Sequence, residues 1–343
     1  MKTPSVAIIF GGTGFIGSFF AKHLLEANYV DRVYLYDFEP LDRKASNFRK
    51  MLLLGIPNIF YIEGDVRCAI NFSLHEVNVK LIANMAAVHR EPGHKDYEYF
   101  ETNLSGAKNV CEFAEKVFCT NIIFTSSISP YGVSESLKDE STLPIPITPY
   151  GSSKLVAEKI HQIWQAKDAI NRRLVVVRPG VVFGPSEGGN VSRLIKAIIG
   201  RYFFFMGNQS TRKAGVYVKE LCHAMLWVLQ KQNINGETYS LFNMSMNPGP
   251  SLGEYVDAIC KTQEIKRLIP IVPYRGLIVF GYLIDGFAKP LGFKHPFSPV
   301  RIRKLIRSNN ILPNYLLKHG YEFQYSLYDA FSDWKKSCPE EWK

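Results

Sequence analysis

Tyr150 and Lys154 are the residues whose types and spacing most directly suggest chemistry. Four residues apart on a helix, their side chains lie on one face and can reach the same pocket. A phenol normally titrates near about 10, and an ammonium beside it favours the deprotonated form. Such a phenol can exchange a proton with a substrate hydroxyl near neutral pH. A pair of this kind also occurs on solvated helices, so the elements around it must decide between the two interpretations.

A glycine-rich turn near the N-terminus is the first of these elements. Residues 5–10 form an apolar run that predicts a buried parallel strand, and residues 19–27 predict a helix. The glycines between them satisfy the G-x-G-x-x-G spacing, in which backbone and a helix N-terminus approach a pyrophosphate. The residues of this predicted dinucleotide site are Gly11, Gly14, Phe15, Ile16 and Gly17.

An acidic residue follows the second predicted strand, residues 33–36. Asp37 stands twenty residues after Gly17, the spacing at which a carboxylate accepts hydrogen bonds from a ribose diol. The same carboxylate would repel a 2′-phosphate, so Asp37 favours NAD over NADP. A helix-capping or loop aspartate is the other interpretation.

Two further predicted strands, residues 58–62 and 81–85, end in residues that could contact the same cofactor. Asp65 could accept a hydrogen bond from an adenine amino group while Val66 packs on the ring. The small side chain of Ala86 would let a cofactor approach closely. An ordinary turn accounts for Asp65 equally well.

A fifth predicted strand, residues 121–124, leads into Ser126 and Ser127. Ligands of doubly wound sheets bind at the carboxyl ends of the strands, so either hydroxyl could bond a substrate hydroxyl or its ketone form. Asn103, inside a predicted helix at 97–118, could hold neighbouring backbone or serve the site indirectly. The alternation continues with a helix at 150–168 and a strand at 174–177, which predicts a parallel α/β sheet.

Length and composition describe a folded chain of two parts. With 343 residues, 46% hydrophobic and 21% charged, the chain can bury a large core. We expect a cofactor-binding domain over residues 1–178, with elements from about 214–243 returning to it. A smaller α/β substrate-binding lobe would take up most of residues 179–343. Six scattered cysteines without a C-x-x-C pair, and no secretory signal, favour a cytoplasmic protein with free, mostly buried thiols.

The net charge of +10 narrows the partners without choosing one. No aromatic-interleaved basic motif supports nucleic acid, whereas an anionic small substrate or a loose attraction to an anionic membrane fits. The apolar residues 276–287 fall short of the roughly 20 residues that span a bilayer, so we expect a buried helix there. The eight histidines show no metal-ligand spacing, and no metal site is expected.

The glycine turn, Asp37, Ser127, Tyr150 and Lys154 together resemble the extended short-chain dehydrogenase/reductase family. More narrowly, they resemble its NAD-dependent nucleotide-sugar epimerase/dehydratase branch, whose fold is a Rossmann-like doubly wound sheet. The resemblance covers roughly residues 5–260 and returns at Gly320-Tyr321. It implies that Ser127 is catalytic, that Tyr150 is the acid/base, and that Lys154 holds the nicotinamide ribose and lowers the pKa of the tyrosine.

The resemblance also implies a substrate contact and an assembly. Arg212 matches an arginine that contacts the diphosphate of a nucleotide sugar, for which a guanidinium fork is suited. A solvated loop arginine is the alternative. Related enzymes commonly form homodimers through two long helices, which here are residues 97–118 and 150–168.

Three departures from the branch limit the reaction. Ile128 and Ser129 stand where sugar 4,6-dehydratases carry an Asp-Glu pair, so the groups for water elimination are missing. Gly180 stands where many 4-epimerases have asparagine. Lys219 and Glu220 replace the usual acidic residue after a Val-Tyr-Val strand, which puts the local salt-bridge pattern in doubt.

The leading hypothesis is an NAD-dependent epimerase of a nucleotide-activated sugar, of the UDP-hexose type, acting at C4. Tyr150 would remove a hydroxyl proton while NAD takes the hydride, and the keto-sugar would turn and be reduced on its other face. The alternative is an NAD(P)-dependent ketoreductase or hydroxy-dehydrogenase on a keto-sugar or steroid-like alcohol, with residues 276–287 lining an apolar pocket. A dinucleotide sensor without chemistry is a third, against which the intact Ser127, Tyr150 and Lys154 argue.

Overall fold

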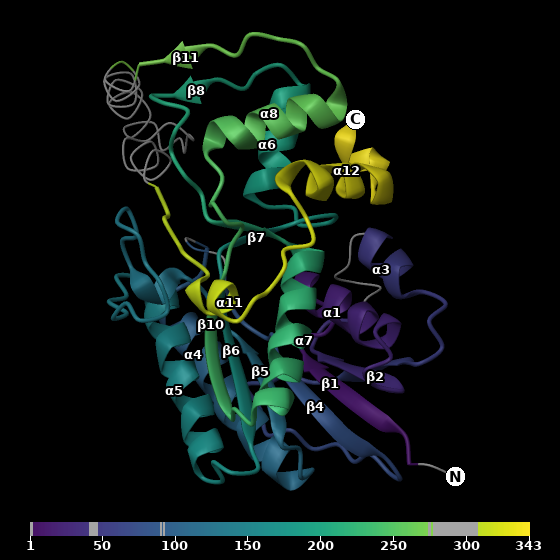
Figure 1. The fold of residues 1–343 in the computed structure, drawn as a ribbon. Helices are drawn as coiled ribbons and strands as arrows, with labels where there is room; N and C mark the ends of the chain where they lie inside the picture. The colour runs from purple at the N-terminus through teal and green to yellow at the C-terminus, as the bar shows by residue number, and fades with distance from the viewer. Residues whose placement is uncertain (1–2, 41–46, 90, 92, 274–275, 277–307) are drawn as a thin grey trace.

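A seven-stranded parallel sheet forms the centre of the protein, in a computed structural model that describes residues 3–40, 47–89, 91, 93–273, 276 and 308–343 (Figure 1). The strand order is β10-β6-β5-β4-β1-β2-β3, and every pairing is parallel. The order reverses between β1 and β4, which is where doubly wound sheets bind ligands. The strands are β1 (Ser5–Phe10), β2 (Arg32–Asp37), β3 (Ile59–Glu63), β4 (Asn78–Asn84), β5 (Asn121–Thr125), β6 (Arg173–Pro179) and β10 (Tyr239–Met244).

Helices cover both faces of this sheet (Figure 1). One face packs against α1 (Phe15–Glu26) and α7 (Val218–Asn235), and the other against α4 (Asp96–Lys116) and α5 (Pro149–Ala166). Alternate residues of β1 belong to the two cores, Ala7 and Ile9 to the first and Val6, Ile8 and Phe10 to the second. A strand buried on both faces has no polar side, which explains why residues 6–10 are all apolar.

A smaller α/β region lies beyond the carboxyl edge of the sheet (Figure 1). It contains two short parallel pairs, β7 with β9 and β8 with β11, and the helices that pack on them. The elements outside the central sheet and its four long helices are α3 (Asn47–Leu53), η1 (Ser129–Tyr131), β7 (Val181–Phe183), α6 (Asn190–Ile199), β8 (Phe205–Met206), β9 (Gly215–Tyr217), α8 (Leu252–Gln263), β11 (Ile271–Val272), α11 (Asn314–Lys318), α12 (Leu327–Ser337) and η2 (Pro339–Trp342).

The sequence predicted the fold class correctly, and each strand expected between residues 5 and 177 is present. The first helix begins at Phe15 rather than at residue 19, because Gly14 itself is the N-cap. The short elements α3 and β7 were missed, since they are too short to show a period. The Val-Tyr-Val strand noted in the sequence is β9. The buried helix expected at 276–287 lies outside the described residues except for Gly276, which is exposed.

Lys219 and Glu220, the departure noted in the sequence, fasten the C-terminal chain to α7. Glu220 is buried and accepts hydrogen bonds from the Tyr321 hydroxyl and from the backbone amides of Gln324 and Tyr325. The Lys219 ammonium pairs with Asp333 on α12 at 2.7 Å. The expected salt-bridge pattern is therefore replaced by two separate anchors for the closing segment.

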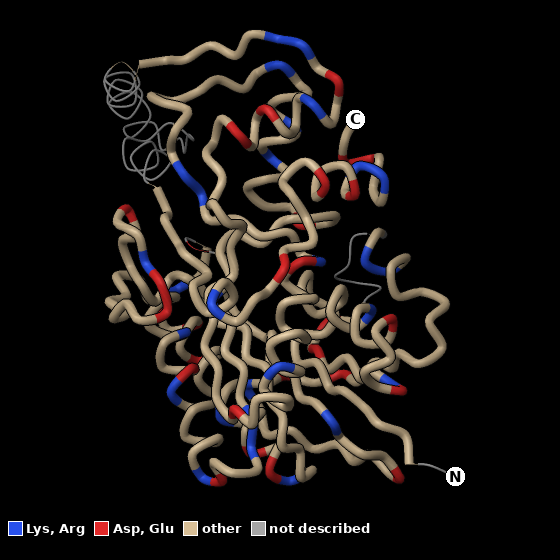
Figure 2. The backbone as a smooth tube through the Cα atoms, in the orientation of Figure 1, with Lys and Arg blue, Asp and Glu red and all other residues tan. Residues whose placement is uncertain are grey.

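Charged side chains are spread over both regions, with basic and acidic residues interspersed along the chain (Figure 2). Within the part of the chain that the structure describes, no helix is long and apolar enough to cross a membrane. The cysteines are free, and four of the six are buried, as the sequence predicted.

The division into residues 1–178 and 179–343, and the homodimer through two long helices, stay predictions. The elements involved do form: β9, α7 and β10 fall close to the range 214–243, and α4 and α5 pack against each other.

The turn after β1 generates a stability prediction. Gly11 has φ of +74°, and a Cβ built there would lie 2.7 Å from the Ala86 nitrogen and 2.8 Å from its Cα. Gly11→Ala should therefore cost about 1–2 kcal/mol for the left-handed backbone and about 1–3 kcal/mol more for the clash. Gly55 is the matched control, because its φ is +83° but no atom lies within 4 Å of the built Cβ. Chemical denaturation should show a clearly larger loss for Gly11→Ala than for Gly55→Ala; equal losses would contradict the close approach.

Candidate active site

The glycine turn between β1 and α1 has room for backbone alone. A Cβ on Gly17 would lie 2.4 Å from the Gly11 carbonyl oxygen, and the Gly11 amide donates to the Tyr36 carbonyl at 2.9 Å. Gly14 begins α1 without a side-chain capping bond, so the amides of the first turn, at Phe15 and Ile16, are not capped by a side chain. A cradle of this kind at a helix N-terminus suits an anionic pyrophosphate, and these residues therefore fit NAD.

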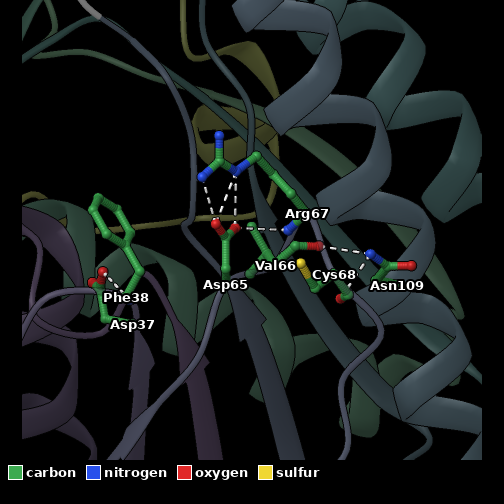
Figure 3. A network of polar contacts seen from close by, with 7 residues as sticks. All are labelled: Asp37, Phe38, Asp65, Val66, Arg67, Cys68 and Asn109. Carbon is green, nitrogen blue, oxygen red and sulfur yellow. Dashed lines mark hydrogen bonds and ion pairs between the residues drawn. The ribbon is translucent and has the colours of Figure 1, made fainter.

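Asp37 stands beside this turn at the end of β2, as the sequence predicts. One oxygen of its buried carboxylate accepts hydrogen bonds from the Thr13 amide at 3.2 Å and the Thr13 hydroxyl at 2.8 Å. Its other oxygen accepts from the Phe38 amide at 3.0 Å (Figure 3). These bonds hold the carboxylate against the turn, where a ribose diol would lie in this fold.

Arg49 is a candidate cofactor-site residue that the sequence did not reveal. It lies on the short helix α3 and donates to the Thr13 carbonyl at 3.1 Å and to the Ser186 hydroxyl at 3.3 Å. Burial lowers the pKa of Arg49, and the nearby carboxylate of Asp37 raises it. The guanidinium therefore links α3, the glycine turn and the second region, and no periodic pattern in the sequence announces α3.

Asp65 and Val66 lie after β3, at the edge shown in Figure 3. The Asp65 carboxylate receives a fork from Arg67, with Nε at 2.9 Å and Nη2 at 2.6 Å, and also accepts from the Arg67 amide. Hydrogen bonds from Arg67 lower the pKa of Asp65. Val66 is buried, and its carbonyl accepts from Asn109 at 2.7 Å. The structure thus gives Asp65 and Val66 an ordinary turn role, and their contact with adenine stays a prediction.

Ala86 lies against Gly11 at the point where the strand order reverses. The contacts measured from the built Gly11 Cβ are with Ala86 backbone atoms, so the two segments approach as closely as backbone allows. The segment that approaches Ala86 closely is therefore the glycine turn. A contact between Ala86 and NAD stays a prediction.

Ser127 and Tyr150 are brought together at the carboxyl edge of the sheet. The Ser127 side chain is near enough to lower the pKa of the phenol, and its hydroxyl donates to the Ser129 hydroxyl at 3.2 Å. Tyr150 lies in the first turn of α5, which Thr148 caps by accepting from the Gly151 amide at 3.1 Å. Ser126, the other serine considered, is directed elsewhere and bonds Glu158. The geometry therefore favours Ser127 as the partner of the phenol.

Lys154 is buried one turn further along α5. Its ammonium donates to the Thr125 carbonyl at 2.8 Å and lies 4.9 Å from the centre of the Phe124 ring. Burial lowers the pKa of Lys154 to about 7, although the carboxylate of Glu158 acts in the opposite direction.

The expected lowering of the Tyr150 pKa is not seen. Burial raises the pKa of Tyr150 to about 12, and the Ser127 side chain opposes this only in part. The reason is that burial disfavours both the phenolate and the ammonium, while Lys154 is directed at the Thr125 carbonyl.

Asn103 connects α4 to the helix that carries Tyr150. Its amide donates to the Ser153 hydroxyl at 2.8 Å, and that hydroxyl donates to the Tyr150 carbonyl at 2.9 Å. Its carbonyl oxygen accepts from the Val88 amide at 3.1 Å. Asn103 therefore plays both roles left open by the sequence, since it holds neighbouring backbone and supports the site.

Arg212 and Gly180 lie in or at the edge of the second region. Arg212 is half-exposed; its guanidinium donates to the Gly249 carbonyl and lies 4.0 Å from the Glu254 carboxylate, so its contact with a substrate diphosphate stays a prediction. A Cβ on Gly180 would lie 2.5 Å from the Ala214 carbonyl oxygen. The asparagine found here in many 4-epimerases therefore does not fit without movement of the backbone.

The fold and site define a dinucleotide-dependent enzyme of the extended short-chain dehydrogenase/reductase type. Residues 7–241 match the NAD dependent epimerase/dehydratase family, and the chain belongs to this family. NAD is its cofactor.

Named relatives extend over nearly the whole chain. The N-acetyl-alpha-D-glucosaminyl-diphospho-ditrans,octacis-undecaprenol 4-epimerase of Escherichia coli O157:H7 is 28% identical, covering 95% of this chain and 96% of the relative. A decarboxylating sterol-4-alpha-carboxylate 3-dehydrogenase of Candida albicans is 26% identical over 89% of each chain. A solved structure, UDP-glucuronic acid 4-epimerase from Bacillus cereus in complex with NAD, shares the fold with a TM-score of 0.73. It is 18% identical, over 98% of this chain and 100% of that chain.

The position of Asp37 predicts cofactor preference. Asp37→Ala should weaken NAD binding by about tenfold and narrow the margin over NADP, because a hydrogen-bond acceptor for the ribose and a repulsive charge are both lost. Fluorescence titration of the purified variant with each dinucleotide measures the two affinities. Asp31→Ala, which removes a carboxylate bonded to Ser5 at the opposite end of the sheet, is the control. If the ratio of the NAD and NADP affinities were the same in Asp37→Ala as in wild type, the carboxylate would not face the ribose.

Proposed function

We propose that the protein inverts C4 of a hexose carried on a diphosphate, with NAD retained through the cycle. The observation that supports this most directly is the placement of Ser127, Tyr150 and buried Lys154 at the same sheet edge as the glycine turn. Family membership supplies the cofactor, and epimerisation needs no net oxidant because the redox change is reversed within one turnover.

Each of the three side chains has a separate task in this proposal. When bound, NAD supplies the acceptor and donor for the hydrogen at C4. Tyr150, as the phenolate left after its own proton is released to water, takes the C4 hydroxyl proton on its phenolic oxygen and returns it when the sugar is reduced. Ser127 orients that phenol and donates to the sugar oxygen, while Lys154 holds a positive charge next to the exchanging proton. Acid–base help of this kind is typically worth about 10²–10⁴ in rate.

A dehydration outcome has no support from the neighbouring residues. Ile128 packs in a small apolar cluster with Tyr131, Ala214 and Ile311, so that position offers no acid to a departing hydroxyl. The pocket would therefore return the keto-sugar to an alcohol rather than eliminate water from it.

The carrier of the sugar is the second part of the proposal. The sequence suggested a nucleotide, of the UDP-hexose type. We favour a polyprenyl diphosphate, because the relative aligned with 95% of this chain acts, by its name, on an undecaprenol-linked sugar. The sterol dehydrogenase aligned with 89% of the chain also has an apolar substrate by name. A guanidinium such as that of Arg212 suits the diphosphate in either carrier.

A substrate comparison tests the carrier and the reaction together. Protein loaded with NAD is incubated with UDP-N-acetylglucosamine, UDP-glucose and N-acetylglucosamine diphosphate linked to a short polyprenol, and the products are separated by C4 configuration. We expect interconversion on the polyprenyl substrate without net NADH. Conversion of the UDP-sugars alone would restore the nucleotide carrier, and net NADH formation or consumption would favour the ketoreductase or hydroxy-dehydrogenase alternative.

The role of Tyr150 predicts a separation between binding and turnover. Tyr150→Phe should leave the NAD dissociation constant unchanged and reduce epimerisation by about 10² or more, because only the exchangeable proton is removed. Tyr202→Phe, on an exposed tyrosine of the second region, is the control. Near-normal turnover by Tyr150→Phe would contradict the assignment.

A further inference from the structure

Glu158 and Arg178 form a buried ion pair behind the candidate active site. Their side chains are 1% and 4% exposed, and the guanidinium donates from Nε at 2.8 Å and from Nη2 at 2.6 Å. Removing two charges from water costs several kcal/mol per ion and is recovered only with good geometry and further hydrogen bonds. Such a pair is weak evidence for stability, so its position relative to the site is the informative feature.

The pair holds the segment that carries Ser127 from both sides. Ser126 donates its hydroxyl to Glu158 at 2.5 Å, and the Arg178 guanidinium lies 4.7 Å from the centre of the Tyr131 ring. Ser127 stands between these two contacts. The segment from 126 to 131 is thereby fixed at its start and its end by one buried ion pair.

Glu158 also belongs to the helix face that carries the other two residues of the site. It follows Lys154 by four residues and Tyr150 by eight, so the three lie on one side of α5. Where α5 begins, a Cβ on Gly151 would lie 2.7 Å from the Ser129 carbonyl oxygen, which shows how closely helix and segment pack. Glu158 makes the corresponding contact two turns further along.

We propose that Glu158 is a positioning residue of this active site, which fixes Ser127 against Tyr150 through Ser126 and Arg178 and places a negative charge one turn from Lys154 on the same face of α5. This inference rests on the proposed function, in which those three residues perform the chemistry. Glu158 touches neither substrate nor cofactor in this account and acts only through its neighbours.

The charges around Lys154 support the electrostatic half of the proposal. On α5 the titratable groups that face it are Tyr150, Glu158 and His161, and β6 contributes Arg178 through Glu158. Burial lowers the pKa of His161 to about 4, so this ring is neutral at physiological pH. From β5, Lys154 meets the Thr125 carbonyl and the Phe124 ring, neither of which carries a charge. Glu158 is therefore the source of negative charge that offsets the burial of Lys154 among the described residues.

The sign of the expected pH effect follows from this arrangement. Burial alone lowers the pKa of Lys154, and the Glu158 carboxylate raises it. Without that carboxylate the ammonium should lose its proton at a lower pH. The alkaline limit of both turnover and NAD affinity should then move toward acid.

Two variants and one control test the inference. Glu158→Gln removes the charge but leaves Arg178 buried without its partner, which can unfold the protein. The double variant Glu158→Gln with Arg178→Met replaces the pair by neutral side chains of similar length, for which little loss of stability is expected. Glu115→Gln is the control. Glu115 lies near the end of α4, away from the site, and the substitution breaks its ion pairs with Lys167 and Arg172. Thermal unfolding identifies which variants are folded.

Turnover, KM and NAD affinity are then measured across pH for wild type, the folded variants and the control. We expect the double variant to lose about 10- to 100-fold in kcat with KM within about twofold, as misplacement of catalytic groups does. Its alkaline midpoint in kcat and in NAD affinity should fall by about one pH unit or more. Glu115→Gln should match wild type in all of these.

Two results would overturn the inference. One is a wild-type kcat and alkaline midpoint in the double variant. The other is a double variant whose kcat falls by the same factor at every pH and whose NAD affinity depends on pH as in wild type. That result would leave Glu158 a purely structural role. If wild type epimerises none of the sugars, the proposed function fails by itself, because NAD affinity against pH still reports on Glu158 and Lys154.

Discussion

Burial of ionisable groups along one face of α5 is the constraint on which the rest of the site depends. Water is withdrawn from Tyr150 and Lys154, which raises the pKa of the phenol and lowers that of the ammonium. Burial therefore disfavours the charged form of each group. Every other polar contact of the site, from Ser127 to the Glu158–Arg178 pair, adjusts this balance.

The parallel sheet makes that burial possible. Strands β5 and β6 end beside α5, so their last residues reach the helix from the core side: Thr125 binds Lys154, and Arg178 binds Glu158. On the other side of the strand-order reversal, the glycines of the turn after β1 present backbone that no Cβ covers. The glycine turn and Tyr150, the proposed cofactor and acid–base positions, therefore lie at one edge for the same topological reason.

Sequence patterns predicted the sheet and the long helices, because these depend on local periodicity; the roles of the candidate site residues stay predictions. Gly11, Asp37, Tyr150 and Lys154 lie on the predicted elements at the same sheet edge. The choice between Ser126 and Ser127 depends on where Glu158 lies, and a carboxylate eight residues beyond Tyr150 carries no local signal of its partners. The predicted direction of the Tyr150 pKa shift was wrong for the same reason, since burial is a property of the packed structure.

The two anchors of the C-terminal chain on α7 have an optical consequence. Lys219 and Glu220 hold the closing segment so that Trp334 and Trp342 enter the core that covers one face of the sheet. Two of the four indole rings in the protein therefore sit in its last few residues, in apolar surroundings. Tryptophan fluorescence of this protein therefore reports in large part on whether the C-terminal segment is packed against the core.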